Sequence, residues 1–357
     1  MRVVVAMSGG VDSSVAAALL AEQGHEVIGV SMQLYDQSPA DDDGAARFGS
    51  CCTIDDLHDA RRVAGQIGIP HYILDFESPF HQHVVRNFVD EYVNGRTPIP
   101  CAHCNSEVKF QTLLQRAEGF GAACLATGHY ARVTREAGGR VALRRGADPA
   151  KDQSYFLFSL TQAQLERAAF PVGALDKDAV RAEARRLGLA VAGKPDSQEI
   201  CFVPDGDYAA FVEAQAGVRP APGVVLDRAG AVLGTHGGVH RFTVGQRKGL
   251  GLSSTVPLYV LEVRPEDQAV VVGPRDALDR DTLTASGVNW IAGAPAAGWR
   301  PVTAQVRHRH RAAPARVRAL APSRAELVFD VPQTAISPGQ AVVFYDGDEV
   351  VGGGWIE

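Results

Sequence analysis

The chain has 357 residues, of which 21 % are charged and 46 % are hydrophobic, so it is long enough for two or three domains with cores of their own. Its formal net charge of −6 at pH 7 argues against a protein that coats nucleic acid over its whole surface. No run approaches the roughly 18 uninterrupted apolar residues that cross a bilayer, so we expect no membrane association and a cytoplasmic location.

Short apolar runs alternate with helical patterns over the amino-terminal half of the chain. Strands are predicted at residues 3–7, 27–32, 71–75 and 124–127. Helices are predicted at residues 13–23, 55–67, 79–94, 105–117, 161–168 and 176–187. This alternation is typical of a Rossmann-like α/β domain, in which helices flank a parallel sheet.

The composition changes after residue 204, where Gly, Pro and Val become frequent. Short alternating runs follow at residues 224–226, 258–263, 269–272, 325–329 and 341–345. Such runs are typical of small antiparallel β units, and we expect the last of these units to be a barrel. The predicted domains are therefore an α/β domain at residues 1–203, a small, mostly-β central domain at 204–276 and a C-terminal β-barrel domain at 277–357.

Residues 8–14, Ser-Gly-Gly-Val-Asp-Ser-Ser, connect the first predicted strand to the first predicted helix. Glycines allow the backbone to approach phosphate oxygens, and a helix start offers unpaired amides and the positive end of the helix dipole. The loop has neither the Gly-Lys-Ser/Thr of a Walker loop nor the spacing of a dinucleotide fingerprint. It resembles the pyrophosphate loop of ATP pyrophosphatases, which hold ATP for attack on the α-phosphate. A purely structural turn is the alternative.

The chain contains six cysteines: Cys51, Cys52, Cys101, Cys104, Cys124 and Cys201. In a reducing compartment, cysteines serve catalysis or metal binding more often than disulfide scaffolds. Cys101 and Cys104 form a C-x-x-C pair, with Cys201 as a distant third candidate. Zinc or iron–sulfur ligation, buried inert thiols and persulfide sulfur transfer all remain open. Arg96 and Lys109 are candidates for an electropositive field that would favour thiolates.

An arginine-rich stretch without an acidic residue runs from residue 300 to residue 324. Within it, Arg307-His308-Arg309-His310-Arg311 alternates, which predicts a strand with its arginines on one face. Phosphate contact is the natural use of such a face. A solvated basic surface is the alternative.

Five motifs together closely resemble the bacterial tRNA-specific 2-thiouridylase family, which belongs to the ATP pyrophosphatase superfamily. They are residues 6–14 (AMSGGVDSS), 100–105 (PCAHCN), 126–132 (ATGHYAR), 151–157 (KDQSYFL) and 242–251 (FTVGQRKGLG). The resemblance implies an ATP-pyrophosphatase-type catalytic domain and a tRNA-binding barrel.

The resemblance also implies the reaction and the partners. The substrate would be the wobble uridine of tRNAs for lysine, glutamate and glutamine. ATP would adenylate the C2 carbonyl, and persulfide sulfur would then displace AMP, giving 2-thiouridine, AMP and pyrophosphate. A cysteine desulfurase or a sulfur-relay protein would supply the sulfur, and Mg²⁺ would accompany the ATP phosphates.

The resemblance assigns the site residues as well. Cys104 would be the nucleophile that forms the disulfide, and Cys201 would carry the persulfide. ATP would be held by Ala6, Met7, Ser8, Gly9, Gly10, Val11, Asp12, Ser13, Met32 and Gly128. The tRNA would be contacted by Ile99, Pro100, Cys101, His129, Lys151, Asp152, Gln153, Arg307, His308 and Gln340.

The chain departs from the family pattern at three of these positions. Cys101 stands where some relatives carry an aspartate with a proton-transfer role, Ile99 replaces the usual asparagine, and His308 replaces the usual tyrosine. An iron–sulfur cluster on Cys101, Cys104 and Cys201 is an alternative that we do not favour. Without the resemblance, His129 also fits a core histidine and Lys151 a solvated lysine.

Two other functions compete with this hypothesis. An ATP-pyrophosphatase ligase that forms amide or amidine bonds would explain the glycine loop but would give Cys104 and Cys201 no role. An RNA-binding protein with a zinc-stabilised C-x-x-C would leave the glycine loop without one.

Overall fold

The computed structural model describes residues 1–35, 54–195, 200–203, 206–217, 221–293 and 298–357. Cys51 and Cys52 lie outside the described residues. The chain divides into two units by its contacts. The first contains Met1–Val84, Cys101–Asp207 and Asp348–Val350, and the second contains Val85–Pro100, Tyr208–Gly347 and Val351–Glu357.

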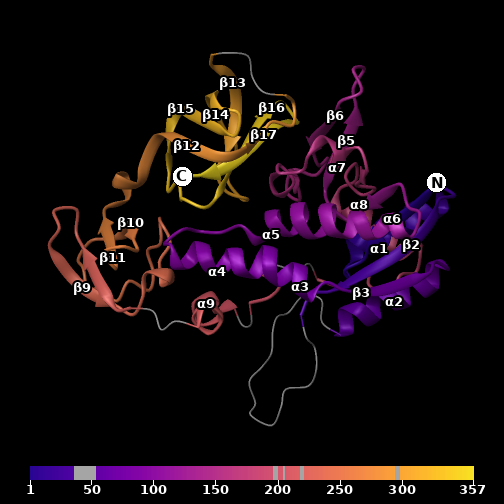
Figure 1. The fold of residues 1–357 in the computed structure, drawn as a ribbon, viewed down its shortest axis with the longest axis horizontal. Helices are drawn as coiled ribbons and strands as arrows, with labels where there is room; N and C mark the ends of the chain where they lie inside the picture. The colour runs from indigo at the N-terminus through magenta and orange to yellow at the C-terminus, as the bar shows by residue number, and fades with distance from the viewer. Residues whose placement is uncertain (36–53, 196–199, 204–205, 218–220, 294–297) are drawn as a thin grey trace, which may run out of the picture. The chain divides into compact units, whose positions relative to one another are not determined.

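A parallel sheet of five strands lies at the centre of the first unit, in the order β3–β2–β1–β4–β7 (Figure 1). The strands are β1 (Arg2–Ala6), β2 (Glu26–Gln33), β3 (His71–Asp75), β4 (Cys124–Ala126) and β7 (Ala168–Ala169). Val3, Val4 and Val5 of the central strand are fully buried because helices cover both of its faces. The predicted Rossmann-like sheet is thereby confirmed.

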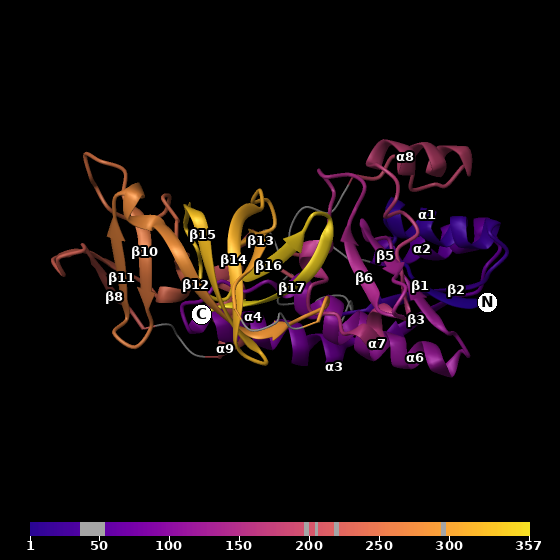
Figure 2. The ribbon, with the colours of Figure 1, turned by 90° about the horizontal axis from the view of Figure 1, so that it is seen from above.

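Three helices cover one face of this sheet: α1 (Val11–Glu22), α2 (Ile54–Ile67) and α8 (Lys177–Arg186). Figure 2 shows them on the side of the sheet opposite α6 (Leu114–Gly119). Val15, Val63 and Val180, one from each helix, pack with Val3 and Val5 in a single core cluster. This packing fixes α1, and therefore the turn before it, against the sheet.

The helix predicted at residues 161–168 is shorter than expected. It is a single turn, α7 (Gln162–Leu165), which Thr161 caps with a capping box. The following residues instead form the edge strand β7, where the carbonyls of Arg167 and Ala169 accept hydrogen bonds from the amides of Leu125 and Thr127. The buried amides of β4 need these acceptors, so sheet pairing overrides the local helical pattern.

Two long helical segments combine α- and π-helical turns. The first runs through α3 (Glu77–Phe80), η1 (His81–Val85) and α4 (Arg86–Val93), and the second through α5 (Pro100–His103), η2 (Cys104–Leu113) and α6. The second begins at Pro100, five residues before the predicted start, because proline is well tolerated in the first turn of a helix. Cys101 and Cys104 therefore lie on a helix, one turn apart.

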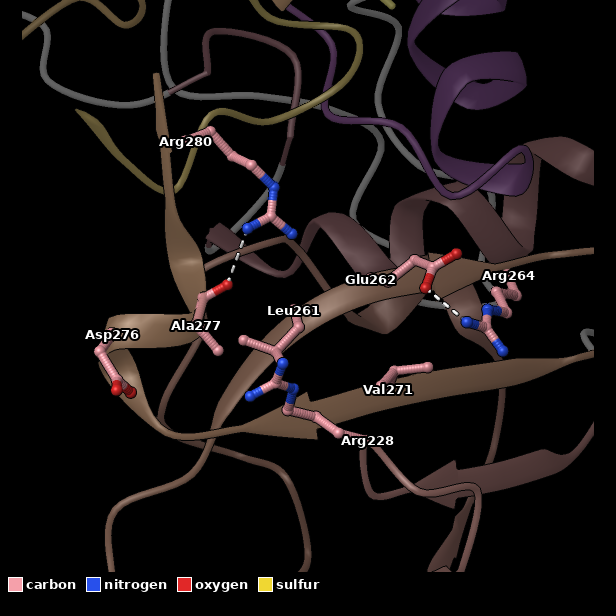
Figure 3. Close-up of a pocket in the computed structure, with 8 residues that line it drawn as sticks. All are labelled: Arg228, Leu261, Glu262, Arg264, Val271, Asp276, Ala277 and Arg280. Carbon is pink, nitrogen blue, oxygen red and sulfur yellow. Dashed lines mark hydrogen bonds and ion pairs between the residues drawn. The ribbon is translucent and has the colours of Figure 1, made fainter. Parts of the chain in front are cut away.

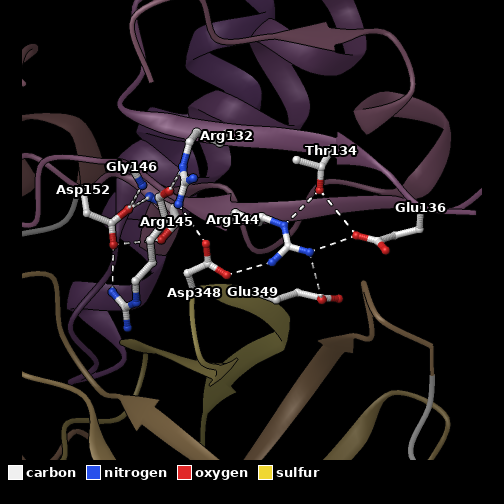
Figure 4. A network of polar contacts seen from close by, with 10 residues as sticks. Arg132, Thr134, Glu136, Arg144, Arg145, Gly146, Asp152, Asp348 and Glu349 are labelled. Atoms are coloured by element: carbon white, nitrogen blue, oxygen red, sulfur yellow. Dashed lines mark hydrogen bonds and ion pairs between the residues drawn. The ribbon is translucent and has the colours of Figure 1, made fainter. Parts of the chain in front are cut away.

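A hairpin of β5 (Ala131–Arg135) and β6 (Val141–Arg145) follows β4, with η3 (Ser154–Phe156) after it. Arg144 is the centre of its polar network (Figure 4). It donates hydrogen bonds to Glu136, Asp348 and Thr134, and its guanidinium lies 3.8 Å from Glu349. Glu349 also pairs with Arg140 at 2.6 Å. These ion pairs bind residues 348–350 to the hairpin within the first unit.

The second unit contains a four-stranded sheet in the order β10–β11–β8–β9. Its strands are β8 (Gly223–Leu226), β9 (Val232–His236), β10 (Tyr259–Arg264) and β11 (Ala269–Gly273). The sheet is not wholly antiparallel as predicted, because β8 and β11 pair in parallel. The unit also contains α9 (Tyr208–Ala216), which the sequence did not indicate. It packs on α4 through a Tyr92–Tyr208 stack at 4.6 Å.

The same unit contains the predicted C-terminal barrel, which is confirmed. Six antiparallel strands follow the order β12–β15–β14–β13–β16–β17, and pairing of β12 with β17 closes the barrel. The strands are β12 (Asp279–Asn289), β13 (Arg300–Gln305), β14 (Ala313–Ala321), β15 (Arg324–Thr334), β16 (Ala341–Asp346) and β17 (Glu349–Ile356). Val317, Leu327, Phe344 and Val351 are fully buried in its core.

The strand predicted at residues 307–311 is wrong. This run forms the turn between β13 and β14, closed by a hydrogen bond from the His310 amide to the Arg307 carbonyl. The Gln305 side chain donates to the carbonyls of Arg307 and His308, which satisfies the turn's backbone. The arginines therefore lie on a turn and do not share a strand face.

Among the described residues, no helix is both long and apolar enough to span a bilayer.

Replacing Arg144 with methionine should lower the free energy of unfolding by about 1 kcal/mol at pH 7, since its ion pairs are partly exposed. Burial alone would raise the pKa of Asp348, but Arg144 and Arg132 outweigh burial and lower it. The stabilisation is thus present above the unfolded-state pKa and is lost as the pH falls through the folded-state pKa.

Denaturant unfolding at neutral and acidic pH would measure this effect. The difference between wild type and Arg144→Met should shrink in acid. Arg135→Met, which removes an exposed arginine from the same hairpin, is the control and should change little at either pH. An Arg144→Met deficit that stays constant with pH would contradict the proposed role of the ion pairs.

Candidate functional site

The turn between β1 and α1 is shaped to hold an anion. Gly9 has a φ of 72°, and a Cβ on it would lie 2.2 Å from the carbonyl oxygen of Asp56, so only glycine fits. Ser8 donates its amide to Ser13 Oγ, which folds the turn back on the helix. Within the described residues, the amides of Gly9, Gly10 and Val11 have no hydrogen-bond acceptor. Free amides at a helix start are suited to phosphate oxygens.

The segment after β4 lies directly against this turn. A Cβ on Gly128 would approach the Ser13 amide nitrogen to 2.5 Å, so the two backbones are in contact. Met32 lies near the end of β2, the strand beside β1. The predicted nucleotide residues 6–13 and Gly128 therefore converge at the carboxyl edge of the parallel sheet, where ligands of open α/β sheets bind.

Asp12 is held by two residues that the sequence analysis did not identify. Lys177 Nζ donates to both carboxylate oxygens of Asp12 at 2.8 and 3.0 Å, and the Tyr130 hydroxyl donates at 2.7 Å. Lys177 is buried and comes from the first turn of α8, far along the chain. A lysine at the start of a helix forms no sequence motif, so the sequence does not indicate that Lys177 reaches the glycine turn, residues 8–14.

Cys104 begins the π-helical segment η2 and is half-buried. Burial raises the pKa of its thiol, and the Lys109 ammonium opposes that rise. Lys109 in turn donates to the Asn105 side chain at 2.9 Å, which fixes the ammonium near the start of η2. π-Helical turns often mark functional sites, and a cation beside a thiol favours the reactive thiolate.

His129 directly follows Gly128, the residue that contacts the turn between β1 and α1. Burial and then the Lys109 ammonium lower its pKa well below 6.5, so the ring is neutral at physiological pH. Its Nδ1 lies 2.6 Å from Thr127 Oγ1. The Lys109 ammonium therefore acts both on the Cys104 thiol and on the histidine that follows Gly128.

Cys201 lies in a short described segment with Phe202, whose side chain is buried. The Phe202 ring packs edge-on against Phe80 of α3 at 5.5 Å. Helix α3 also packs against η2, which begins with Cys104. The described cysteines Cys101, Cys104, Cys124 and Cys201 form no disulfide.

Several predicted tRNA-binding residues also support the local fold. Asp152 accepts hydrogen bonds from Arg145 and from the amides of Gly146 and Ser154 (Figure 4). Gln153 accepts from the Tyr130 amide at 3.0 Å. A tRNA role for these side chains stays a prediction, and so it does for Lys151, which is half-buried.

The predicted contacts in the second unit differ in exposure. Gln340 donates to the carbonyls of Thr97 and Pro98. These hydrogen bonds support the segment between α4 and α5, which leads to the buried residues Ile99 and Pro100. Arg307 and His308 are exposed on their turn, and the Arg307 guanidinium donates to the Thr334 carbonyl.

A hollow of about 510 Å³ in the second unit was not foreseen (Figure 3). Arg228, Arg264 and Arg280 line it together with Glu262 and Asp276. Arg264 pairs with Glu262, and Arg280 donates to the Ala277 carbonyl. These arginines come from separate strands and loops, so no local motif indicates that they share a surface.

The role of Lys109 predicts a change in thiol reactivity. Lys109→Met removes the cation that opposes the burial effect, so the Cys104 pKa should rise and alkylation of Cys104 should need a higher pH. Peptide mass spectrometry after timed iodoacetamide treatment at several pH values would measure it. Cys124, whose pKa burial raises to about 11 against the effect of Arg167, is an internal reference.

Arg116→Met, which removes an exposed cation from the following helix, is the matched control and should leave Cys104 unchanged. An unchanged Cys104 profile in Lys109→Met would show that Lys109 does not tune this thiol.

Comparison with known proteins gives consistent results along the whole chain. The model described as "tRNA methyl transferase HUP domain" matches residues 1–205, "tRNA methyl transferase PRC-barrel domain" matches 209–274, and "Aminomethyltransferase beta-barrel domain" matches 280–356.

Similar full-length relatives are each named tRNA-specific 2-thiouridylase MnmA. The protein of Geotalea uraniireducens (strain Rf4) is 54% identical over 100% of this chain and 95% of the relative. The protein of Geobacter metallireducens is 54% identical over 100% of this chain and 96% of the relative. The protein of Solibacter usitatus is 54% identical over 99% of each chain. The chain therefore belongs to the tRNA-specific 2-thiouridylase family.

Proposed function

We propose that this protein is an ATP-dependent tRNA-uridine 2-sulfurtransferase. The observation that carries the proposal is that one lysine acts both on the thiol of η2 and on the histidine that follows Gly128. Gly128 contacts Ser13 of the turn, and Lys109 acts electrostatically on both His129 and Cys104. A nucleotide on the turn and a thiol on η2 would thus serve one reaction.

In the first step, the C2 oxygen of the wobble uridine attacks the α-phosphate of ATP and pyrophosphate leaves. The carbonyl becomes electrophilic because AMP is a far better leaving group than oxide. The free amides of Gly9, Gly10 and Val11 would bind the phosphates. The Asp12 carboxylate beside the turn has oxygen lone pairs left after its contacts with Lys177 and Tyr130, which fits an oxygen-coordinated Mg²⁺ on ATP.

In the second step, the terminal sulfur of a persulfide on Cys201 attacks C2, and AMP leaves with the former carbonyl oxygen. The Cys104 thiolate then attacks the inner sulfur of Cys201. The sulfur–sulfur bond breaks, its outer sulfur stays on the base as 2-thiouridine, and a Cys104–Cys201 disulfide remains for a thiol reductant. The packing of Phe202 on α3, which also contacts η2, supports pairing these two cysteines.

The wobble base must leave its stack to reach such a site, and a loop nucleotide does so at modest cost. We propose that Ile99, Pro100 and Cys101 meet the base, and that His129, Lys151, Asp152, Gln153, Arg307, His308 and Gln340 contact the tRNA. The substrates would be tRNAs for lysine, glutamate and glutamine. The reaction would take place in the cytoplasm. A cysteine desulfurase or sulfur-relay protein would load Cys201.

Other activities explain fewer of these features. The family-model descriptions mention methyl transfer, but a methyl transferase would need neither the pyrophosphate-type turn nor a cation-flanked thiol. An amide ligase would use the turn and leave Cys104 without a role. An iron–sulfur cluster on Cys101, Cys104 and Cys201 stays an unfavoured alternative.

Cys104→Ser and Cys201→Ser should each abolish 2-thiouridine formation and leave tRNA-dependent pyrophosphate release nearly intact, because only sulfur transfer needs the thiols. The assay supplies ATP, Mg²⁺, a persulfide source and unmodified tRNA, followed by nucleoside mass spectrometry. Cys124→Ala is the control and should keep full activity. Thiolation that survives in either serine variant would refute the mechanism.

Arg307→Ala with Arg309→Ala should weaken tRNA binding and reduce the salt slope of the binding constant by about two, since each phosphate contact contributes about one. Titrations at several salt concentrations would measure the slope. Arg62→Ala with Arg86→Ala removes the same charge from exposed helical positions and is the control. An equal slope in both double variants would mean that the turn does not contact tRNA.

A further inference from the structure

Lys194 joins three segments of the first unit that are far apart in sequence. Its ammonium donates to the Gly9 carbonyl at 3.1 Å, to Asp56 Oδ1 at 2.5 Å and to Asp59 Oδ2 at 2.7 Å. Gly9 belongs to the nucleotide turn, both aspartates belong to the first turns of α2, and Lys194 precedes Cys201 by seven positions. Lys194 belongs to none of the motifs that indicated a site in the sequence.

The contact with Gly9 orients the peptide that follows it. A trans peptide is planar, so its C=O and N–H point in opposite directions. With the Gly9 oxygen drawn toward Lys194, the Gly10 amide must point away from Lys194. That amide has no acceptor within the described residues, so it is available to an incoming phosphate oxygen.

The two aspartates prevent Lys194 from leaving this position. Burial lowers the pKa of Lys194, but hydrogen bonds and charge attraction from Asp56 and Asp59 outweigh burial and raise it, so the ammonium stays charged. The start of α2 also packs directly on the turn, because the Asp56 carbonyl leaves no room for a Cβ at Gly9. At Gly9, the turn is thus fixed by the hydrogen bond from Lys194 and by the steric contact with Asp56.

We propose that Lys194 is a positioning residue that holds the Gly9–Gly10 peptide in the orientation that binds the polyphosphate of the nucleotide. It acts through the turn and does not itself touch the phosphates, since its three donors are already engaged. The inference rests on the proposed use of ATP. It predicts that the loss of Lys194 impairs recognition of the phosphates and spares recognition of the adenosine.

The test compares equilibrium binding of ATP, pyrophosphate and adenosine to Lys194→Met by isothermal titration calorimetry, with Mg²⁺ present. We expect ATP and pyrophosphate to bind on the order of tenfold more weakly, as for the loss of one charge-assisted hydrogen bond, and adenosine to bind as to wild type. In turnover, KM for ATP should rise more than kcat falls. Lys194→Arg, which keeps the charge and the donors, should restore most of the affinity.

Arg186→Met is the matched control. Arg186 also bridges two carboxylates, Glu22 and Glu183, but in the part of the chain that the structure describes it has no hydrogen bond or ion pair with residues 8–14, so its loss should leave all three affinities unchanged. Should Lys194→Met fail to fold, Lys194→Gln, which keeps a donor without the charge, is expected to show the same selective loss.

Two results would overturn the inference: unchanged ATP affinity in a folded Lys194 variant, or an equal loss of ATP and adenosine, which would indicate general loosening. Failure of the proposed function would look different, because the wild-type protein itself would then bind no ATP or form no 2-thiouridine.

Discussion

Close backbone packing ties the glycine turn, residues 8–14, to α2 and to the segment after β4. One side of the turn meets the carbonyl of Asp56 and the other meets the segment at Gly128, and neither contact leaves space for a Cβ. The turn can therefore exist only where α2, β4 and α1 are already in place. Its free amides are a product of tertiary packing as much as of the local sequence.

Three lysines from distant parts of the chain converge on this sheet edge. Lys177 binds Asp12, Lys194 binds Gly9, and Lys109 acts on His129 and Cys104. Each ammonium is held by a fixed partner, so the positive field is oriented before a ligand arrives. A chain with a net charge of −6 can thus offer a local site suited to polyphosphate.

The second unit supplies a different kind of surface. A closed barrel has no free strand edges, so its turns and loops are free to carry polar side chains. The turn with Arg307 and His308 is of this kind, whereas the arginine-lined hollow is formed mainly by the four-stranded sheet and the start of β12. Arg280 and Arg307 each donate to a backbone carbonyl, and Arg264 pairs with the carboxylate of Glu262.

The parallel sheet, the barrel, the glycine turn and the family can all be predicted from the sequence, because they depend on local periodicity and on motifs whose residues are contiguous. The predicted start of the helix that carries Cys101 and Cys104 is five residues too late, because a proline in the first turn can begin a helix. The predicted strand at residues 307–311 is wrong because Gln305 satisfies the backbone of a turn there. The packed structure brings Lys177 and Lys194 to the turn, and it brings Lys109 near enough to act electrostatically on both Cys104 and His129. The residues around a lysine in the sequence do not indicate which group it will bind. Each lysine and its partner become neighbours only when the sheet and its helices have packed.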